Sequence, residues 1–390
     1  MKIDISDERY SRLELIPWWD QKILSSAKIF VAGCGALGNE IVKNLAMLGV
    51  GNIFVADMDN VELSNLTRSV LFRKEDLGKP KAEVICNRAK EINNEISIKY
   101  FIGNIFNIGE GEFRNFDIVI CGLDNREARL YINRICWKVN RPWIDGAIES
   151  LTGVARMFVP PGSACYECTM SETDYKILNK RKSCMLLGID EISEGKIPTT
   201  PTAASIIGGI QVQEAVKYLH NRKENLLLEG KGFVFTGNNN DSYIVTYQRN
   251  EDCPSHYTYD NIFTEKQNFS EAKLIDIFEA GKRIFGDMNF IVEFNNEVVY
   301  ELHDENSNTS KKYFGNMNLM SAKDVKKNKE EFFKIRSFHS LKPINDISEK
   351  FSGKKLTELK IPFNDIFTLR KDEKEIQLEF TRHEIFKQHS

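Results

Sequence analysis

The sequence lacks any long apolar run and any excess of basic residues. No stretch of its 390 residues approaches the roughly 20 apolar residues that a membrane-spanning helix requires, and the start "MKIDISDERYSR" has no apolar signal region. The formal net charge of −3 at pH 7 provides no basic field for binding nucleic acid. We therefore expect a cytoplasmic protein that binds neither membranes nor nucleic acid.

Cysteine is also scarce. Eight cysteines in a chain of this length are too few for a disulfide scaffold, and the pair Cys165 and Cys168 is spaced for a metal in a reducing compartment. The hydrophobic content of 42% is ordinary, and the chain is long enough for two or three domains. A folded, globular protein is expected.

Strands and helices alternate through the first half of the chain. An apolar run at 29–32 precedes a helix expected from about 39 to 48, and a second run, "IFVAD", follows at 53–57. The stretches "KAEVICNRAKEINNEISIKYFIGN", "FDIVICGLDN" and "EARLYINRICWKVNRPWIDGA" repeat this order. The pattern predicts an α/β fold with a Rossmann-like, doubly wound, mostly parallel sheet, which binds ligands at the carboxyl ends of its strands.

The later part of the chain changes character. A long helix is expected at 201–219 and a hairpin at 232–247, where "GNNND" supplies the turn. Polar, turn-rich sequence then ends the α/β pattern, so we place one domain at 1–256 and a smaller α+β domain at 257–390. Within the second domain, "NFIVEFNNEVVYEL" predicts another hairpin.

The glycine-rich segment "GCGALG" indicates a nucleotide site. Gly33, Gly35 and Gly38 allow a tight turn, approach of the backbone to a phosphate, and close packing of helix on strand. Asp57 lies 19 residues after Gly38, where an acidic side chain can accept hydrogen bonds from a ribose. These features predict an adenine nucleotide but do not separate NAD from ATP.

Polar residues after the second strand favour ATP. A dehydrogenase does not need Asn65, Arg68 and Lys81 beside its ribose-binding acid, whereas a triphosphate does. Arg68 and Lys81 can neutralise charge that develops on phosphates during transfer. Asp124 ends the strand "VICGLDN", where its carboxylate can hold Mg²⁺.

Six motifs occur in this order: "GCGALG", "DMDNVELSNLTR", "LGKPKAE", "CGLDN", "CYEC" and "IPTTPTAASIIGGIQVQEAVKYL". They resemble the motifs of the ubiquitin-activating (ThiF/MoeB-like) superfamily, and the resemblance covers residues 1 to about 256. It implies that Asp57 binds the ribose of ATP, and that Asn65, Arg68 and Lys81 hold the phosphates. It further implies that Asp124 binds magnesium.

The resemblance extends to the N-terminal segment "ERYSR". In the family, the second arginine of this segment reaches into the neighbouring subunit's active site, so Arg12 is its counterpart and a homodimer is implied. One position departs from the family: Ser69 stands where a glutamine usually follows the arginine, which removes one phosphate contact and predicts slower adenylation.

A metal site is expected from two pairs of ligands. Cys165 and Cys168 form one pair, and "CPSH" supplies Cys253 and His256 with the same two-residue gap. Three cysteines and one histidine suit a closed, tetrahedral, structural zinc site. Family members usually end this motif in Cys-Pro-x-Cys, so His256 is a departure that zinc tolerates.

A further cysteine is the candidate nucleophile. Cys184 follows the metal-binding pair and precedes "KIPTTPTAASIIGG", within a segment at about 169–200 where the family carries its thioester-forming cysteine. Arg181 and Lys182 would favour its thiolate, which is the form that attacks an acyl group.

Together these features predict an enzyme that adenylates the C-terminal carboxylate of a ubiquitin-like protein, forms a thioester on Cys184, and transfers it to a conjugating enzyme. "SGKKLTELKIPFNDIFTLRKDEKEIQLEF" resembles the final strands of a ubiquitin-type β-grasp, which eukaryotic activating enzymes use to recruit that partner. Three alternatives stay open: a sulfur-carrier adenylyltransferase of the molybdopterin or thiamine type, a non-catalytic partner subunit, and an NAD-dependent oxidoreductase.

Overall fold

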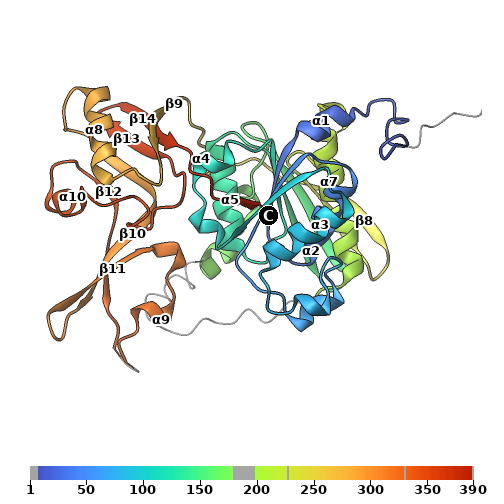
Figure 1. The fold of residues 1–390 in the computed structure, drawn as a ribbon, viewed down its shortest axis with the longest axis horizontal. Helices are drawn as coiled ribbons and strands as arrows, with labels where there is room; N and C mark the ends of the chain where they lie inside the picture. Colours follow the sequence, from blue (N-terminus) through green and yellow to red (C-terminus); the bar gives the residue numbers. More distant parts are fainter. Residues whose placement is uncertain (1–7, 179–197, 226–227, 329–330, 389–390) are drawn as a thin grey trace, which may run out of the picture.

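The computed structural model describes residues 8–178, 198–225, 228–328 and 331–388, and its strands form two sheets (Figure 1). The nine strands of the first sheet are β1 Lys28–Ala32, β2 Asn52–Asp57, β3 Ser97–Ile102, β4 Ile118–Cys121, β5 Trp143–Glu149, β6 Thr152–Phe158, β7 Lys231–Thr236, β8 Asp241–Thr246 and β15 Lys387–Gln388. Their order is β15-β3-β2-β1-β4-β5-β6-β7-β8. The central run from β3 to β5 is parallel, and β6, β7 and β8 continue it antiparallel.

Helices cover both faces of the first sheet, as the continuous apolar runs of its central strands require. In β1, Ile29 and Val31 point to one face and Phe30 and Ala32 to the other. The first face packs against α2 Ala36–Met47, α3 Lys81–Ile92 and α7 Pro201–Leu219. The second packs against α4 Glu110–Phe113 and α5 Arg126–Lys138. The predicted doubly wound, mostly parallel sheet is therefore confirmed.

The second sheet contains six strands of the C-terminal part. They are β9 Ile262–Asn268, β10 Ile291–Asp304, β11 Thr309–Asn316, β12 Lys334–Leu341, β13 Phe367–Lys371 and β14 Lys374–Thr381. The main path runs β11-β10-β13-β14-β9, with β12 paired to β10. Helix α8 Leu274–Phe285 buries its apolar face on this sheet. The short helices α1, α9 and α10 span Gln21–Ser26, Ala322–Val325 and Asp346–Phe351.

The end of the chain returns from the second sheet to the first. Strand β15 pairs antiparallel with the edge strand β3, and the red terminus of the ribbon lies against the first sheet in Figure 1. Phe386 is buried beside Phe30 and Phe54, which lie on β1 and β2. The hydrophobic core on this face of the first sheet thus includes residues from both sides of the domain boundary expected at 256. The division into two domains and the β-grasp assignment stay predictions.

Two local predictions need correction. The helix expected from about Asn39 begins at Ala36, because Gly35 is its N-cap and the helix starts inside the glycine motif. The hairpin expected within 289–302 is wrong, because β10 runs through this stretch as one strand. Asn295 donates to Ile366 O over 2.6 Å and Asn296 is buried, so the two asparagines form an irregularity in the strand and not a turn. The hairpin of β7 and β8 and the helix at 201–219 are confirmed.

Candidate functional site

A cavity of about 940 Å³ opens at the carboxyl ends of β1, β2 and β4. Residues from separate segments of the chain meet there, including most of those predicted for the nucleotide: Gly33, Gly35, Asp57, Asn65, Arg68, Lys81 and Asp124. Gly38 packs beneath the cavity and does not line it. The structure thus brings the predicted nucleotide residues together, while their roles remain predictions.

The conformation and close packing of the glycine segment leave no room for a side chain at Gly33 or Gly38. Gly33 has φ +92°, and a Cβ there would lie 2.8 Å from Gly122 O. A Cβ on Gly38 would lie 2.0 Å from Gly33 O, so no other residue fits at this point of α2. At Gly35 there is open space instead. The loop therefore packs tightly on its inner side and leaves its outer side open at the start of a helix, where backbone N–H groups can bind an anion.

Asp57 and Lys81 share the cavity wall with Asp59, which sequence reasoning missed. Asp57 Oδ2 accepts from Cys34 N over 2.6 Å, and Lys81 Nζ lies 2.8 Å from Asp59 Oδ2. Burial raises the pKa of the Asp57 carboxyl. Burial opposes charge on Lys81, but the hydrogen bond to Asp59 and the nearby Asp57 outweigh it and raise the Lys81 pKa. Lys81 is therefore a cation at neutral pH. The spacing "DMD" was the signal for Asp59.

The loop between β2 and α3 carries the other predicted phosphate ligands. Asn65 is buried and its Oδ1 accepts from Glu62 N over 3.0 Å, which fixes a short 3₁₀ turn. Arg68 Nη1 donates to Ser64 O over 2.8 Å. Ser69 is buried and lines the cavity, where a longer glutamine would reach further inward.

Asp124 lies in the connection between β4 and α5. Asn125 caps α5 by accepting from Ala128 N over 2.8 Å. Asp124 precedes this cap, is exposed and lines the cavity. An exposed carboxylate beside a phosphate site suits Mg²⁺, which takes one or two protein oxygens and keeps several waters.

A buried charged cluster at the cavity wall was also missed. Asp145 is fully buried, and Arg156 Nε donates to its Oδ2 over 3.0 Å. Arg129 Nε lies 3.0 Å from Asp145 Oδ1 without the alignment of a hydrogen bond. Two arginines around one carboxylate leave this three-residue cluster with a net positive charge. Asp145 and Arg156 are cross-strand partners on β5 and β6, whereas Arg129 comes from α5.

Two predicted catalytic residues are not among those that line the cavity, and only one of them, Arg12, is described by the structure. Arg12 is exposed in the segment before α1 and does not line the cavity of its own chain. Cys184 lies outside the described residues, so its role stays a sequence-based prediction.

The four predicted metal ligands form a cluster. All ligand atoms of Cys165, Cys168, Cys253 and His256 lie within 4.8 Å of one another. The Sγ atom of Cys165 is 3.7 Å from that of Cys168 and 3.6 Å from that of Cys253, and Cys168 Sγ is 3.4 Å from His256 Nε2. Zinc–sulfur bonds of about 2.3 Å in a tetrahedron separate ligand atoms by about 3.8 Å. The cluster therefore has the size and donor set of a structural zinc site.

Comparison with protein-family models identifies the class. The ThiF family model matches residues 8–255. That range is more than half of the chain and includes the cavity and the three cysteines of the cluster. The chain belongs to the ThiF family.

Among curated proteins, the relatives include activating-enzyme subunits. The chain is 42% identical over 159 residues to the NEDD8-activating enzyme E1 catalytic subunit of Dictyostelium discoideum, covering 37% of this chain and 35% of that one. It is 36% identical over 157 residues to the SUMO-activating enzyme subunit uba-2 of Caenorhabditis elegans, covering 39% and 27%. The chain thus spans between about a fifth and two fifths of the length of these curated relatives.

Among solved structures, E. coli MccB in complex with ATP is similar, with a TM-score of 0.55, 26% sequence identity, and coverage of 65% of this chain and 75% of that one. MccB with AMPCPP and MccA gives a TM-score of 0.54 at 26% identity, covering 64% and 74%. Among the described residues, no helix is both long and apolar enough to cross a membrane.

Proposed function

We propose that this chain is an adenylyltransferase that activates the C-terminal carboxylate of a ubiquitin-like carrier protein with ATP. The observation that carries the proposal is the meeting of Asp57, Asn65, Arg68, Lys81 and Asp124 around one cavity beside the glycine loop. The NEDD8- and SUMO-activating relatives and the ATP complex of MccB support the same chemistry.

The reaction joins the carboxylate to the α-phosphate of ATP. A carboxylate oxygen of the carrier attacks the α-phosphorus, the bond to the bridging oxygen breaks, and pyrophosphate leaves. Asp57 would hold the ribose, while Arg68 and Lys81 would neutralise negative charge on the phosphates. Mg²⁺ on Asp124 would supply further charge neutralisation. The product is an acyl adenylate, in which a stable carboxylate has become a good acyl donor.

A second step uses the cysteine predicted from the sequence. The thiolate of Cys184 attacks the acyl carbon of the adenylate, AMP leaves, and a thioester forms. A conjugating enzyme then accepts the acyl group. Zinc on Cys165, Cys168, Cys253 and His256 has a structural role in this scheme. Because Arg12 lies away from its own cavity, the proposal includes a homodimer in which Arg12 serves the partner's site.

A partner related to MccA is the second candidate substrate. The observation that favours it is the MccB complex with MccA, because the chain covers more of MccB than of the activating enzymes. The two candidates share adenylation and differ in the acyl donor. The sulfur-carrier alternative would also adenylate a carboxylate, but it needs no thioester on Cys184.

Exchange of pyrophosphate into ATP tests the adenylation step. We expect Lys81→Ala and Asp124→Asn each to lower carrier-dependent exchange by at least about 100-fold, since removing one charge-stabilising group costs this much in comparable sites. The measurement is incorporation of labelled pyrophosphate into ATP in the presence of candidate carriers.

Lys79→Ala is the matched control. Lys79 lies two residues before Lys81, is more than half exposed, and pairs with Asp76 outside the cavity lining. The Lys79→Ala variant should exchange pyrophosphate into ATP at the wild-type rate. Equal activity of Lys81→Ala and Lys79→Ala would refute the proposed site, and exchange driven by an MccA-like peptide alone would favour the second candidate.

A further inference from the structure

We infer that Asn39 is a positioning residue of this site, which orients the phosphate-binding amides of the glycine loop and ties them to the loop that carries Arg68. The inference rests on the proposed function. Asn39 lies in the first turn of α2 and is fully buried. Its amide bonds two separate segments of the chain, and it does not line the cavity itself.

The amide nitrogen of Asn39 holds two carbonyls of the glycine loop. Nδ2 donates to Cys34 O over 3.0 Å and to Gly35 O over 2.9 Å. In a trans peptide the N–H of the next residue points opposite to the carbonyl. Holding these carbonyls inward therefore directs the N–H groups of Gly35 and Ala36 outward, and both residues line the cavity. A phosphate at this helix start would accept from these two groups.

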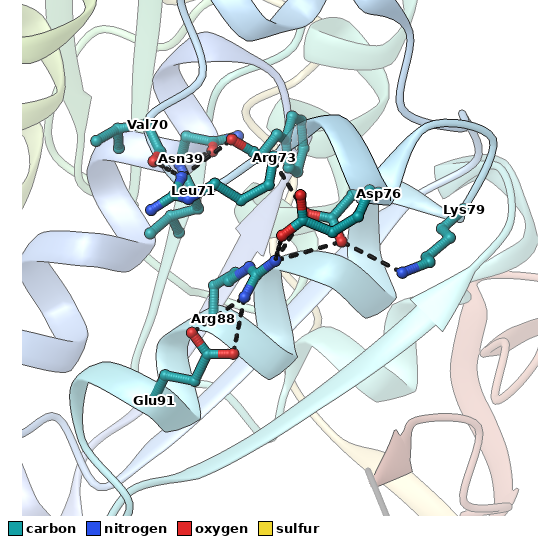
Figure 2. Close-up of polar contacts among 10 residues, drawn as sticks. Asn39, Val70, Leu71, Arg73, Asp76, Lys79, Arg88 and Glu91 are labelled. Carbon is teal, nitrogen blue, oxygen red and sulfur yellow. Dashed lines mark hydrogen bonds and ion pairs between the residues drawn. The ribbon is translucent and has the colours of Figure 1, made fainter.

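The amide oxygen of Asn39 holds the second loop. Oδ1 accepts from Leu71 N over 2.9 Å, three residues after Arg68. Figure 2 shows Asn39 beside Leu71, with the next part of the loop fastened by Asp76. Asp76 accepts from Arg73 N over 2.9 Å and from Arg88 Nη2 over 3.1 Å. The loop is thus attached to α2 at Leu71 and to α3 at Asp76.

A single side chain therefore uses both of its polar atoms to couple two loops. Gly33 and Gly35 have no side chains that could hold the peptide planes of the first loop, so its orientation depends on groups outside it: Asp57 accepts from Cys34 N, and Asn39 donates to the Cys34 and Gly35 carbonyls. Asn39 supplies that constraint from within α2. Its loss should affect the binding of phosphates and leave the binding of adenosine unchanged, because Asp57 has its own hydrogen bonds from Cys34 and Asp59.

Calorimetric titration of the full chain with ATP and with adenosine tests the inference. We expect Asn39→Ala to weaken ATP binding by at least about 10-fold, equivalent to one charge-assisted contact, with adenosine binding unchanged. Asn39→Asp keeps an acceptor for Leu71 N but replaces the donor with a carboxylate oxygen. It should lose ATP affinity to the same extent, and it decides the question if Asn39→Ala does not fold.

Asn93→Ala is the control for a structural effect. Asn93 is equally buried, donates to Ala46 O over 3.0 Å, and lies away from the cavity. It should lose thermal stability with an unchanged ratio of ATP to adenosine affinity. An unchanged ratio in both Asn39 variants, or an equal change in Asn93→Ala, would overturn the inference. Wild-type protein that binds no ATP would instead overturn the proposed function, and the inference with it.

Discussion

At the scale of single residues, neighbouring carboxylates fix the charge and the position of Lys81 in the cavity wall. Lys81 lies near both Asp57 and Asp59, and the two carboxylates keep it protonated although it is largely removed from solvent. The Asp59 side chain is about half exposed, at 54%, so the Lys81–Asp59 pair contributes little to stability. The ion pair instead keeps the lysine charged and in position beside the cavity.

Mutation can distinguish the step that needs the predicted nucleophile from the step that needs the nucleotide residues. We expect Cys184→Ala to keep carrier-dependent pyrophosphate exchange and to lose any carrier adduct that a reductant cleaves, because adenylation precedes thioester formation. Gel electrophoresis with and without reductant shows the adduct.

The neighbouring substitution Ser183→Ala is the control and should retain the adduct. An adduct that survives Cys184→Ala and vanishes with reductant would assign the nucleophile to another cysteine. Cys168 is an unsuitable candidate while zinc is bound, because a coordinated thiolate is committed to the metal.

At the scale of elements, helix α5 joins the two halves of the cysteine cluster. Asn133 on α5 accepts from Tyr166 N over 3.0 Å and donates to Ser255 Oγ over 2.9 Å. Trp137 of the same helix stacks on His256, with ring centroids 4.9 Å apart. The cluster therefore anchors two distant segments onto the helix that begins beside Asp124.

We expect one zinc per chain. Closing this site should contribute on the order of 10 kcal/mol to folding, so Cys253→Ser should lose the metal and lower the temperature of unfolding sharply. Plasma emission analysis of purified protein measures the zinc. Cys86→Ser, a buried cysteine outside the cluster, should keep a full equivalent. Well under one zinc in the wild type would refute the site.

At the scale of the whole molecule, the C-terminal part packs on the first sheet. Strand β15 pairs with β3, and Phe386 joins the aromatic cluster of Phe30, Phe54 and Phe116. Arg382 also pairs with the buried Glu112 of α4 over 3.0 Å. Removing residues 257–390 would expose this surface, so we expect the fragment 1–256 to be less stable than the intact chain.

Phe386→Ala tests this packing with one change. Truncating a buried phenylalanine costs about 3–5 kcal/mol, and we expect the free energy of unfolding in denaturant to fall by that amount. Phe263→Ala is the control, because that side chain is 50% exposed on β9. A stable fragment 1–256 with full exchange activity would show that the tail is dispensable.

A carboxyl group buried between the two parts should make stability depend on pH. Burial raises the pKa of Asp365 to about 7, and the nearby Glu110 adds to the effect. An unfolded aspartate loses its proton near pH 4. Between these values the folded chain binds more protons, so the stability contributed by this group falls as pH rises from about 4 to 7.

Asp365→Asn should therefore raise the unfolding temperature at pH 8 by at least about 2 °C and change it little near pH 4. The amide keeps the acceptor for Asn295 Nδ2, which lies 3.1 Å from Asp365 Oδ1. Asp372→Asn, in an exposed turn, should leave the pH profile unchanged. An equal shift at both pH values would refute this account.

The sequence by itself determined the elements and most of the cavity, because their signals are local. Short continuous apolar runs set the central strands of the first sheet, and the glycine spacing reflects steric limits within a few residues, as at Gly33 and Gly38. Asp57, Asn65, Arg68 and Asp124 follow strands whose carboxyl ends meet at one edge in any parallel sheet. The two cysteine-containing pairs likewise predicted the metal cluster from their spacing.

Only the tertiary structure decided which distant side chains meet. The ion pair of Arg129 with Asp145, the bond from Asn39 to Leu71, and the pairing of β15 with β3 join segments with no shared periodicity. The Asn–Asn pair within β10 has the composition of a turn, yet packing and a hydrogen bond to Ile366 O keep it extended. Local propensity is weak beside such contacts, which depend on the whole fold.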